Sequence, residues 1–195
     1  MRLRLLRLAT PLLFTSLAAG PLLARAENGF SLKGGAMNLW DDTQTLDGVP
    51  RALDDVSQRT FVIGWEHRRR NGAAFGLEYL SYRNEFTPPA GPDTGLAKNE
   101  VLQFVARKYF APSSMAHPFL GLGIGTSRTT VSFDSPTAYT KYDWNLALQF
   151  NGGVELRLDD NFAIALEIKT LFTDVDSHHY DPSATGAFVG AAVLF

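Results

Sequence analysis

The sequence predicts an all-β protein, an eight-stranded antiparallel transmembrane β-barrel that runs up and down as a meander. Apolar and polar residues alternate along most of the chain, and successive side chains of a strand point to opposite faces. The connections between these stretches alternate between long and short. The 195 residues include no cysteine, so neither a disulfide framework nor a thiolate site is available. The hydrogen-bonded sheet must therefore supply the stability.

Residues 1–26 are predicted to be a secretory signal peptide that is removed during export. Three arginines within residues 1–7 precede the apolar run LATPLLFTSLAAGPLL, and residues 24–26 form a small-x-small cleavage site. An uncleaved anchor is the alternative, but prolines and a glycine interrupt the run, which is short for a helix crossing roughly 30 Å of hydrocarbon. Residues 27–195 are then one barrel domain.

The charge balance of residues 27–195 excludes one class of partner. The signal segment holds four of the 18 basic residues and none of the 20 acidic ones, which leaves a formal charge of −6. Binding to nucleic acid depends on neutralising phosphates with Lys and Arg, so nucleic acid is not an expected partner. Lipopolysaccharide remains possible, because divalent cations can bridge it to carboxylates.

The first three predicted strands lie at 29–40, from about 60 to a tight turn at 69–72, and at 73–86. This turn joins the second and third strands, and its Asn-Gly pair suits a hairpin that needs positive φ. Each strand has an apolar face for lipid and a more polar face for the interior. The apolar faces carry Phe30, Leu32, Ala36, Trp40, Phe61, Ile63, Trp65, Phe75, Leu77 and Tyr79.

The fourth and fifth predicted strands are 99–110 and a strand that opens with PFLGLGIGTS at 118–127. In the fifth strand, leucine and isoleucine alternate with Gly121, Gly123 and Gly125. Glycine on the inner row is expected where long side chains of neighbouring strands must fit inside a narrow barrel.

The last three predicted strands begin with 142–158, which holds the longest alternation of the chain. The turn 159–161 follows, then a strand from Phe162 that places Glu167 and Lys169 inside. The closing strand is GAFVGAAVLF. Its lipid-facing row is Ala187, Val189, Ala191, Val193 and Phe195.

The connections predict how the barrel is oriented. Those after the first, third, fifth and seventh strands are the longer loops 41–57, 87–98, 134–140 and 174–183, and the others are short. Bacterial barrels have an even number of strands, short periplasmic turns and longer extracellular loops. A soluble lipocalin-like barrel would instead turn its apolar residues inward.

Eight charged residues fall on the predicted inner row. A barrel of eight strands is just wide enough to be filled by side chains, so these charges should pair and close the barrel. A conducting or gating role is the alternative. The residues are Lys33, Glu66, Glu78, Arg107, Glu155, Arg157, Glu167 and Lys169.

Several segments resemble one known family. They are GFSLKGGAMNLW at 29–40, PFLGLGIGTS at 118–127, NGGVELRLDDNFAIALEIK at 151–169 and the terminal Phe195. Together they resemble the small OmpA/OmpX-like outer-membrane β-barrel family over essentially all of residues 27–195.

The resemblance implies export by the general secretory pathway to the outer membrane of a Gram-negative bacterium. It implies contact with outer-membrane lipids and lipopolysaccharide, and a barrel-assembly machinery that reads Phe195 and its strand. We expect a monomer. Members of this family act as envelope-structural proteins, adhesins, resistance factors or narrow pores.

Two loops hold candidate binding residues. Clustered carboxylates and histidines are ligands for zinc or calcium, but no spacing here matches a known ligand pattern, so we expect solvated loops and assign no metal, cofactor or catalytic residue. Both loops, 41–57 and 174–183, remain candidates for a surface ligand. The candidates are Asp41, Asp42, Asp47, Asp54 and Asp55 in the first loop, and Asp174, Asp176, His178, His179 and Asp181 in the last.

A lipid A-modifying enzyme is the remaining hypothesis. Barrels that remove an acyl chain from lipid A share a His-x-Ser-Asn segment, whereas this chain has Ser177-His178-His179-Tyr180. His67 and His117 are isolated beside predicted turns, and we expect both at the membrane interface. The leading hypothesis is therefore a non-catalytic barrel, envelope-structural or surface-binding through its extracellular loops, with a narrow pore or a lipid A deacylase as alternatives.

Overall fold

The computed structural model describes residues 27–41, 43–46, 49–53, 56–87, 95–111, 114–133, 139–173 and 181–195. The predicted signal peptide therefore lies outside the described residues. No helix in these ranges is long and apolar enough to cross a membrane. The strands are β1 (Glu27–Leu39), β2 (Thr43–Leu46), β3 (Val49–Leu53), β4 (Gln58–Arg68), β5 (Ala73–Thr87), β6 (Gly95–Tyr109), β7 (Ala116–Phe133), β8 (Tyr139–Arg157), β9 (Phe162–Thr173) and β10 (Ala184–Leu194).

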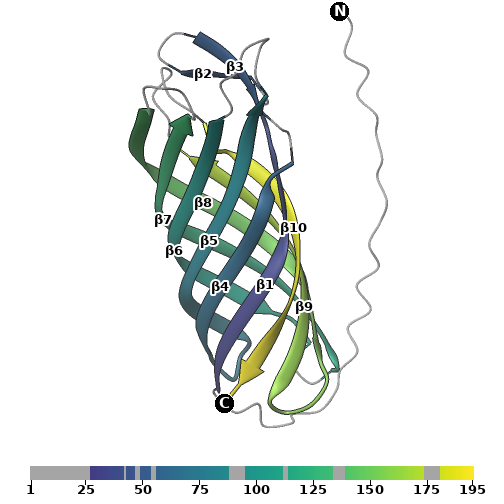
Figure 1. Cartoon of the computed structure of the whole chain (residues 1–195). Coiled ribbons are helices and arrows are strands. Elements are labelled where there is room, and N and C mark those ends of the chain that lie inside the picture. Colours follow the sequence, from purple (N-terminus) through teal and green to yellow (C-terminus); the bar gives the residue numbers. More distant parts are fainter. Residues whose placement is uncertain are drawn as a thin grey trace, which may run out of the picture.

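Eight of these strands close into an antiparallel barrel (Figure 1), as the alternation predicts. Strands β4 to β10 each pair with their neighbours along the chain, and β1 pairs with both β4 and β10. The strands tilt strongly against the barrel axis, which is what lets eight strands enclose a narrow interior. The sheet has no free edge around the barrel wall, so the backbone groups there are paired between strands.

One end of the barrel, here called the turn end, carries the short connections and the C-terminus. The Asn28 amide donates to the Phe195 carbonyl at 2.8 Å, and the Phe195 amide donates to the Asn28 carbonyl at 2.9 Å. The turn at 69–72 is closed by a 2.9 Å bond from the Gly72 amide to the Arg69 carbonyl. Gly72, the last residue of this turn, has φ of +79° and therefore lies in the left-handed region that glycine adopts readily.

The opposite end, here called the loop end, differs from the sequence prediction in its boundaries. The predicted loop 41–57 contains a short hairpin, β2 and β3, that stands above the barrel (Figure 1). The predicted loop 87–98 is wrong at its end, because β6 already begins at Gly95. Similarly, β8 begins at Tyr139 rather than after 140. β6 and β8 both begin before the alternating apolar rows from which their predicted starting residues were taken.

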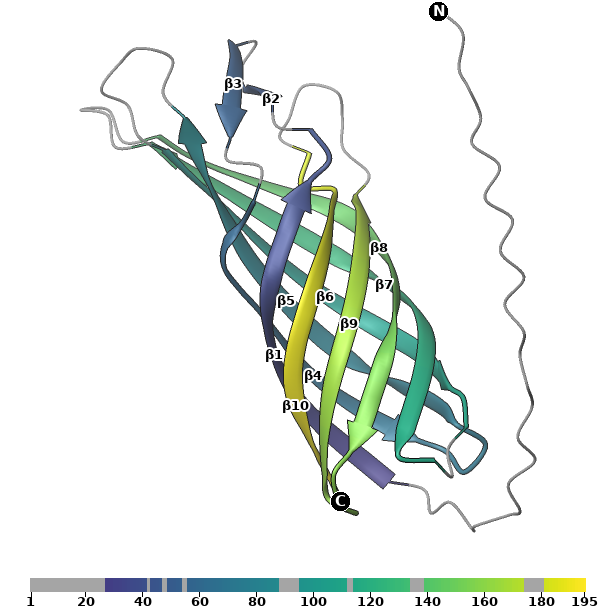
Figure 2. The same ribbon diagram turned by 90° about the vertical axis from the view of Figure 1, so that its right-hand side faces the viewer.

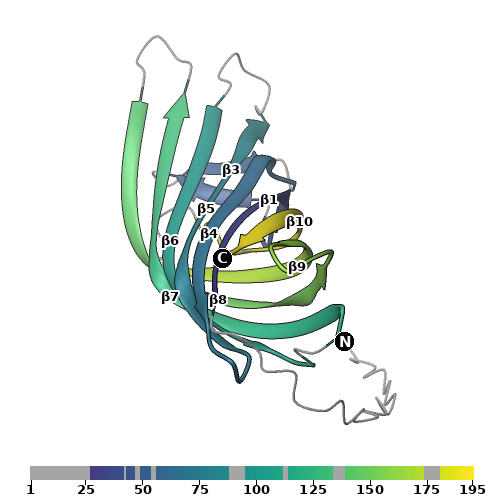
Figure 3. The same ribbon diagram turned by 90° about the horizontal axis from the view of Figure 1, so that it is seen from below.

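Four strands extend at the loop end as an open sheet. Pairing of β7 with β8 continues to Phe133 and Tyr139, whereas β8 pairs with β9 only from Ala147 onward. The sheet formed by the upper parts of β5, β6, β7 and β8 therefore leans out from the barrel mouth (Figures 2 and 3). Among the described residues, 139–146 of β8 have no strand partner on the side of β9, a length of roughly 26 Å at 3.3 Å per residue.

The outer face of the barrel is apolar along its length. Leu32, Leu77, Leu122, Phe150 and Leu166 are each more than half exposed. Alternate residues of the same strands point inward and are buried. A soluble protein rarely exposes a continuous apolar belt of this kind, whereas a barrel surrounded by lipid requires it.

Candidate functional site

The interior at the turn end contains a network of ion pairs, here called the charged layer: Lys33, Glu66, Arg68, Glu78, Arg107, Glu155, Glu167 and Lys169. Arg107 joins its parts, with its guanidinium 3.0 Å from Glu66 Oε2 and 2.5 Å from Glu78 Oε2. Lys169 Nζ lies 2.6 Å from Glu78 Oε1 and 2.7 Å from Glu167 Oε1. Lys33 also pairs with Glu167. The carboxylates and cations therefore neutralise one another across the barrel.

The eight charges proposed from the sequence all lie on the inner face. Seven are buried, and Arg157 is partly exposed at the turn end, where it pairs with Glu27. Sequence reasoning missed Glu27 and Arg68. The predicted second strand runs to the turn at 69–72, but its inner row was taken only as far as Glu66. Arg68 is two residues further along and therefore on the same face.

Arg68 occupies a central place among the charges at the turn end. Its Nη1 and Nη2 atoms donate to the two Glu155 carboxylate oxygens at 2.6 Å each, a bidentate geometry. Its Nε donates to Glu66 Oε1 at 2.6 Å, and its guanidinium lies 4.3 Å from the Tyr109 ring centroid. The Tyr109 hydroxyl also donates to Glu66 Oε1, at 2.7 Å. Removing one member would leave its partners charged and buried, which is strongly unfavourable.

The interior at the loop end contains an apolar cluster beside buried polar side chains such as Asn99 and Thr129, and this corrects the expectation of a polar interior throughout. We call this set the apolar layer. Its side chains come from all eight barrel strands, and Tyr82 donates a hydrogen bond to the Pro182 carbonyl. The members are Met37, Leu39, Val62, Leu80, Tyr82, Phe86, Ala97, Val101, Val131, Ala147, Leu171, Ala184 and Phe188.

The two layers together fill the barrel. Glu78 and Lys169 in the charged layer, and Leu80, Tyr82 and Leu171 in the apolar layer, are all at most 2% exposed. An open aqueous channel would leave its walls in contact with water. The described interior is instead packed in the manner expected of a narrow eight-stranded barrel.

The inner glycines of β7 make room for this packing, as their position in the sequence predicts. A Cβ atom on Gly121 would lie 2.8 Å from the Arg107 Cγ atom and 2.3 Å from Asn151 Oδ1. A Cβ atom on Gly123 would lie 3.2 Å from Gln103 Oε1. Because Gly121 and Gly123 have no side chain, long polar side chains from the neighbouring strands fit into the barrel at these positions.

The two described histidines lie in different places. His67 is exposed, and its Nδ1 atom is 3.1 Å from Asn28 Oδ1. His117 is 3% exposed, so its predicted position at the membrane interface is wrong. It points into the turn end of the barrel, where Nε2 lies 2.6 Å from the Ser114 carbonyl oxygen. Neither histidine makes a described hydrogen bond to a serine hydroxyl.

Most candidate ligands of the two loops lie outside the described residues. These include Asp42, Asp47, Asp54 and Asp55 of the first loop, and residues 174–180 of the last. Within the described ranges, no group of three or more His, Asp or Glu side chains has the arrangement of a metal site. Asp181 instead has a local role, since its carboxylate accepts hydrogen bonds from the Thr173 hydroxyl and the Ser183 amide.

A charged and aromatic cluster, here called the outer rim cluster, lies on the outer face where the open sheet leaves the barrel: Tyr79, Lys98, Glu100, Arg128 and Trp144. Glu100 Oε1 accepts hydrogen bonds from Lys98 Nζ at 2.6 Å and from the Tyr79 hydroxyl at 2.7 Å. Glu100 is opposite Arg128, whose guanidinium lies 5.6 Å from the Trp144 ring centroid. Aromatic and cationic side chains together are typical of the level at which lipid meets water.

Comparison with known proteins gives structural matches only. No protein-family model matches the sequence, and no curated protein is similar at a significant level. Among solved structures, the attachment invasion locus protein Ail of Yersinia pestis, solved with the heparin analogue sucrose octasulfate, has a TM-score of 0.58 at 16% identity, covering 87% of this chain and 99% of Ail.

Two further structures match over the same extent. Neisserial surface protein A has a TM-score of 0.59 at 14% identity, covering 87% of this chain and 95% of that one. The outer membrane protein OprG of Pseudomonas aeruginosa has a TM-score of 0.57 at 12% identity, covering 87% and 96%. At these identities the comparisons establish the fold. The chain has the closed eight-stranded fold of small outer-membrane β-barrels, the architecture of the OmpA/OmpX-like family that its sequence resembles.

Proposed function

We propose that this chain is a non-catalytic protein of the Gram-negative outer membrane that acts by binding at its extracellular face. The observation that carries the proposal is the filled interior. The charged layer and the apolar layer occupy the barrel in series, so passage of a solute would require both to open. What remains available to a partner is the surface, above all the open sheet and the loops at the loop end.

The proposed location and orientation follow from the apolar belt and from the asymmetry of the ends. Short turns and both ends of the barrel domain lie together, as in bacterial barrels whose short turns face the periplasm. Export through the general secretory pathway is supported by the leader at 1–26. Phe195, exposed on the outer face, is suited to recognition by the assembly machinery. We propose that the barrel acts as a monomer.

The outer rim cluster supports an anionic saccharide or phosphate as the class of surface ligand. Arg83 pairs in register with Lys98 on the outer face of the open sheet, and Arg128 lies on the next strand. Cations at this level face the phosphates of lipopolysaccharide or the sulfates of an external polysaccharide. The similarity to Ail, solved with a sulfated sugar, favours the same ligand chemistry.

The alternatives are a narrow pore and a lipid A-modifying enzyme. The pore is disfavoured by the burial of both interior layers. The enzyme needs a serine hydroxyl beside its histidine base. Among the described residues, His67 contacts an asparagine side chain and His117 a backbone carbonyl, which gives neither of them an activated serine.

The test is direct binding by the mature barrel in phosphatidylcholine nanodiscs. We expect sucrose octasulfate to bind in calorimetric titrations and to bind more weakly as salt rises, because exposed charges are screened. The double variant Arg83→Gln, Lys98→Gln should lose affinity severalfold, and the charge-conserving Arg83→Lys, Lys98→Arg should retain it. Equal binding by both variants would contradict the assigned ligand class. A change in lipid A mass in cells making the protein would show the enzyme alternative to be correct.

A further inference from the structure

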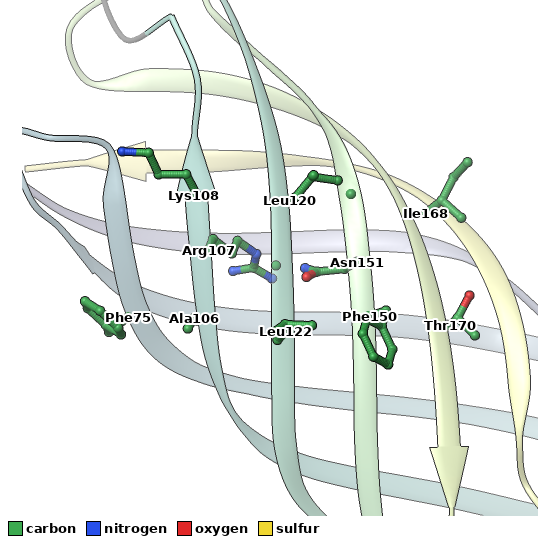
Figure 4. A pocket seen from close by; sticks show the side chains of 12 residues that line it. Phe75, Ala106, Arg107, Lys108, Leu120, Leu122, Phe150, Asn151, Ile168 and Thr170 are labelled. Atoms are coloured by element: carbon green, nitrogen blue, oxygen red, sulfur yellow. The ribbon is translucent and has the colours of Figure 1, made fainter. Parts of the chain in front are cut away.

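The lipid-facing wall contains a hollow of about 770 Å³ that crosses five neighbouring strands from β5 to β9 (Figure 4), next to a smaller hollow of about 290 Å³ that shares Ala106, Leu122 and Phe150 with it. Its floor is formed where small residues stand on the outer face, Ala106 on β6 and Gly152 on β8. The side chains that rise around this floor are apolar. They are Phe75, Leu120, Leu122, Phe150 and Ile168.

The strand register explains why the hollow has this shape. Ala106 is opposite Leu122, and Gly152 lies between Leu120 and Ile168 in the next row of outward residues. Each small residue therefore stands beside large ones from neighbouring strands. The result is a trough between the large side chains.

The trough runs obliquely through the membrane. It begins at Phe75, two residues after the start of β5 at the turn end, and reaches Thr170, three residues before the loop end of β9. Four strand spacings of about 4.8 Å give it a length of roughly 19 Å. Figure 4 shows Phe75 and Lys108 toward one side of the hollow and Ile168 and Thr170 toward the other. Its length and direction suit an extended hydrocarbon chain.

A group of three cations, here called the turn-end cations, lies where the trough meets the edge of the membrane: Arg69, Arg70 and Lys108. All three are exposed. The Arg69 guanidinium lies 5.5 Å from the centroid of the Phe75 ring, and Lys108 donates a hydrogen bond from Nζ to the Asn71 carbonyl. No described carboxylate forms an ion pair with any of the three. An apolar trough with cations at one end is complementary to an anionic lipid.

We propose that the trough binds one anionic glycerophospholipid of the periplasmic leaflet, with an acyl chain along Ala106 and Gly152 and the phosphate beside the turn-end cations. The assignment to that leaflet rests on the orientation given under the proposed function. A second copy of the chain is a less suitable occupant. Two copies related by an axis normal to the membrane would bring their turn-end cations together at the same level, which is electrostatically unfavourable.

The experiment is native mass spectrometry of the mature barrel released from detergent with defined lipids. The probes are palmitoyl-oleoyl phosphatidylglycerol and the zwitterionic palmitoyl-oleoyl phosphatidylethanolamine. We expect one phosphatidylglycerol to be retained in preference to phosphatidylethanolamine. A cation near a membrane surface contributes about 1 kcal/mol to lipid binding. Lys108→Gln should therefore weaken the affinity for phosphatidylglycerol about fivefold, and Arg69→Gln should have a similar effect.

The trough itself is tested by filling it. Ala106→Leu should abolish retention, whereas Ala191→Leu, which adds the same side chain to the outer face of β10 away from the trough, should not. Arg59→Gln, at the loop end, is the matched control for charge. The heat-dependent shift of folded barrels on gels verifies that each variant is folded, and the charge variants keep the proposal testable if Ala106→Leu does not fold.

Equal retention of the two lipids by the wild-type protein would overturn the proposal. So would equal effects of Ala106→Leu and Ala191→Leu. A dimer that disappears on Ala106→Leu would assign the trough to a second copy instead. These outcomes are independent of sucrose octasulfate binding and of lipid A chemistry, so failure here is distinguishable from failure of the proposed function.

Discussion

Glu167 is one of the two carboxylates of the charged layer that each pair with three cations; Glu78 is the other. The Glu167 carboxylate contacts Lys33, Arg107 and Lys169, and it is buried. Glu167→Gln would leave these cations with less counter-charge in a site that water does not reach. We expect the free energy of unfolding to fall by about 3–5 kcal/mol. Urea titrations in lipid vesicles, followed by tryptophan fluorescence, measure this change.

The matched control is Glu85→Gln, because Glu85 is exposed on the outer face of β5. Surface substitutions of this kind usually change stability by less than about 0.5 kcal/mol. Equal unfolding free energies for the two variants would mean that the charged layer contributes no net stability.

Gly72 gives a second test at the residue scale. Its φ of +79° lies in the left-handed region, and a Cβ atom there would be 2.4 Å from the Tyr109 carbonyl oxygen. Gly72→Ala should cost at least 1–2 kcal/mol, a rough value for a non-glycine residue in this conformation. Gly34→Ala is the control, since no atom lies within 4 Å of its Cβ position. The same urea titrations compare them, and a smaller loss for Gly72→Ala than for Gly34→Ala would contradict the turn geometry.

Alternation predicts much of the site at this scale. Lys33, Glu78 and Glu167 occupy inner positions because the period of two fixes the face once the lipid-facing row is known. The ion-pair partners could not be predicted, since the sequence does not give the stagger between strands. The apolar layer was missed for another reason. Tyr79-Leu80 and Leu171-Phe172 place apolar residues on both faces, so the expectation of a polar interior does not hold at Leu80 and Leu171.

Among the elements, the connection between β9 and β10 has two parts. Residues 181–183 belong to the packed barrel mouth, because Asp181 and Ser183 bond to Thr173 and the Pro182 carbonyl accepts from Tyr82. Replacing residues 174–180 with Gly-Ser-Gly should therefore leave the barrel folded. The heat-dependent gel shift checks this outcome.

Extending that replacement through Ser183 should lower stability, since the bonds to Thr173 and Tyr82 would be lost. The predicted loop 174–183 coincides with the interval between β9 and β10, and its last three residues are held in place by these hydrogen bonds. If both replacements destabilised the barrel equally, the division of this connection at Asp181 would be wrong.

Element boundaries at the loop end were the least predictable part of the fold. The strands were located by their apolar rows, which stop where the lipid stops. β6 and β8 begin with residues such as Lys98 and Thr140, which do not continue the apolar row, so the hydrophobic signal starts later than the strand does. The turn end was predicted more closely, because its turns follow directly after apolar rows.

At the scale of the whole molecule, the charged layer and the apolar layer follow one another along the barrel axis, and each blocks the interior. Ion pairs close the turn end and apolar packing closes the loop end. A substitution that weakens one of these layers leaves the other in place. Lys33→Ala should therefore remain non-conducting, and so should Tyr82→Ala, in contrast to a barrel gated by a single set of ion pairs.

Planar-bilayer recording of the mature wild-type barrel tests the central claim most directly. An open sixteen-stranded porin serves as the positive control, since barrels of that size leave an aqueous channel. We expect no discrete conductance steps from this protein at any voltage at which the control conducts. Discrete steps from the wild-type barrel, absent when the protein is left unfolded, would contradict a closed interior and assign it a pore function.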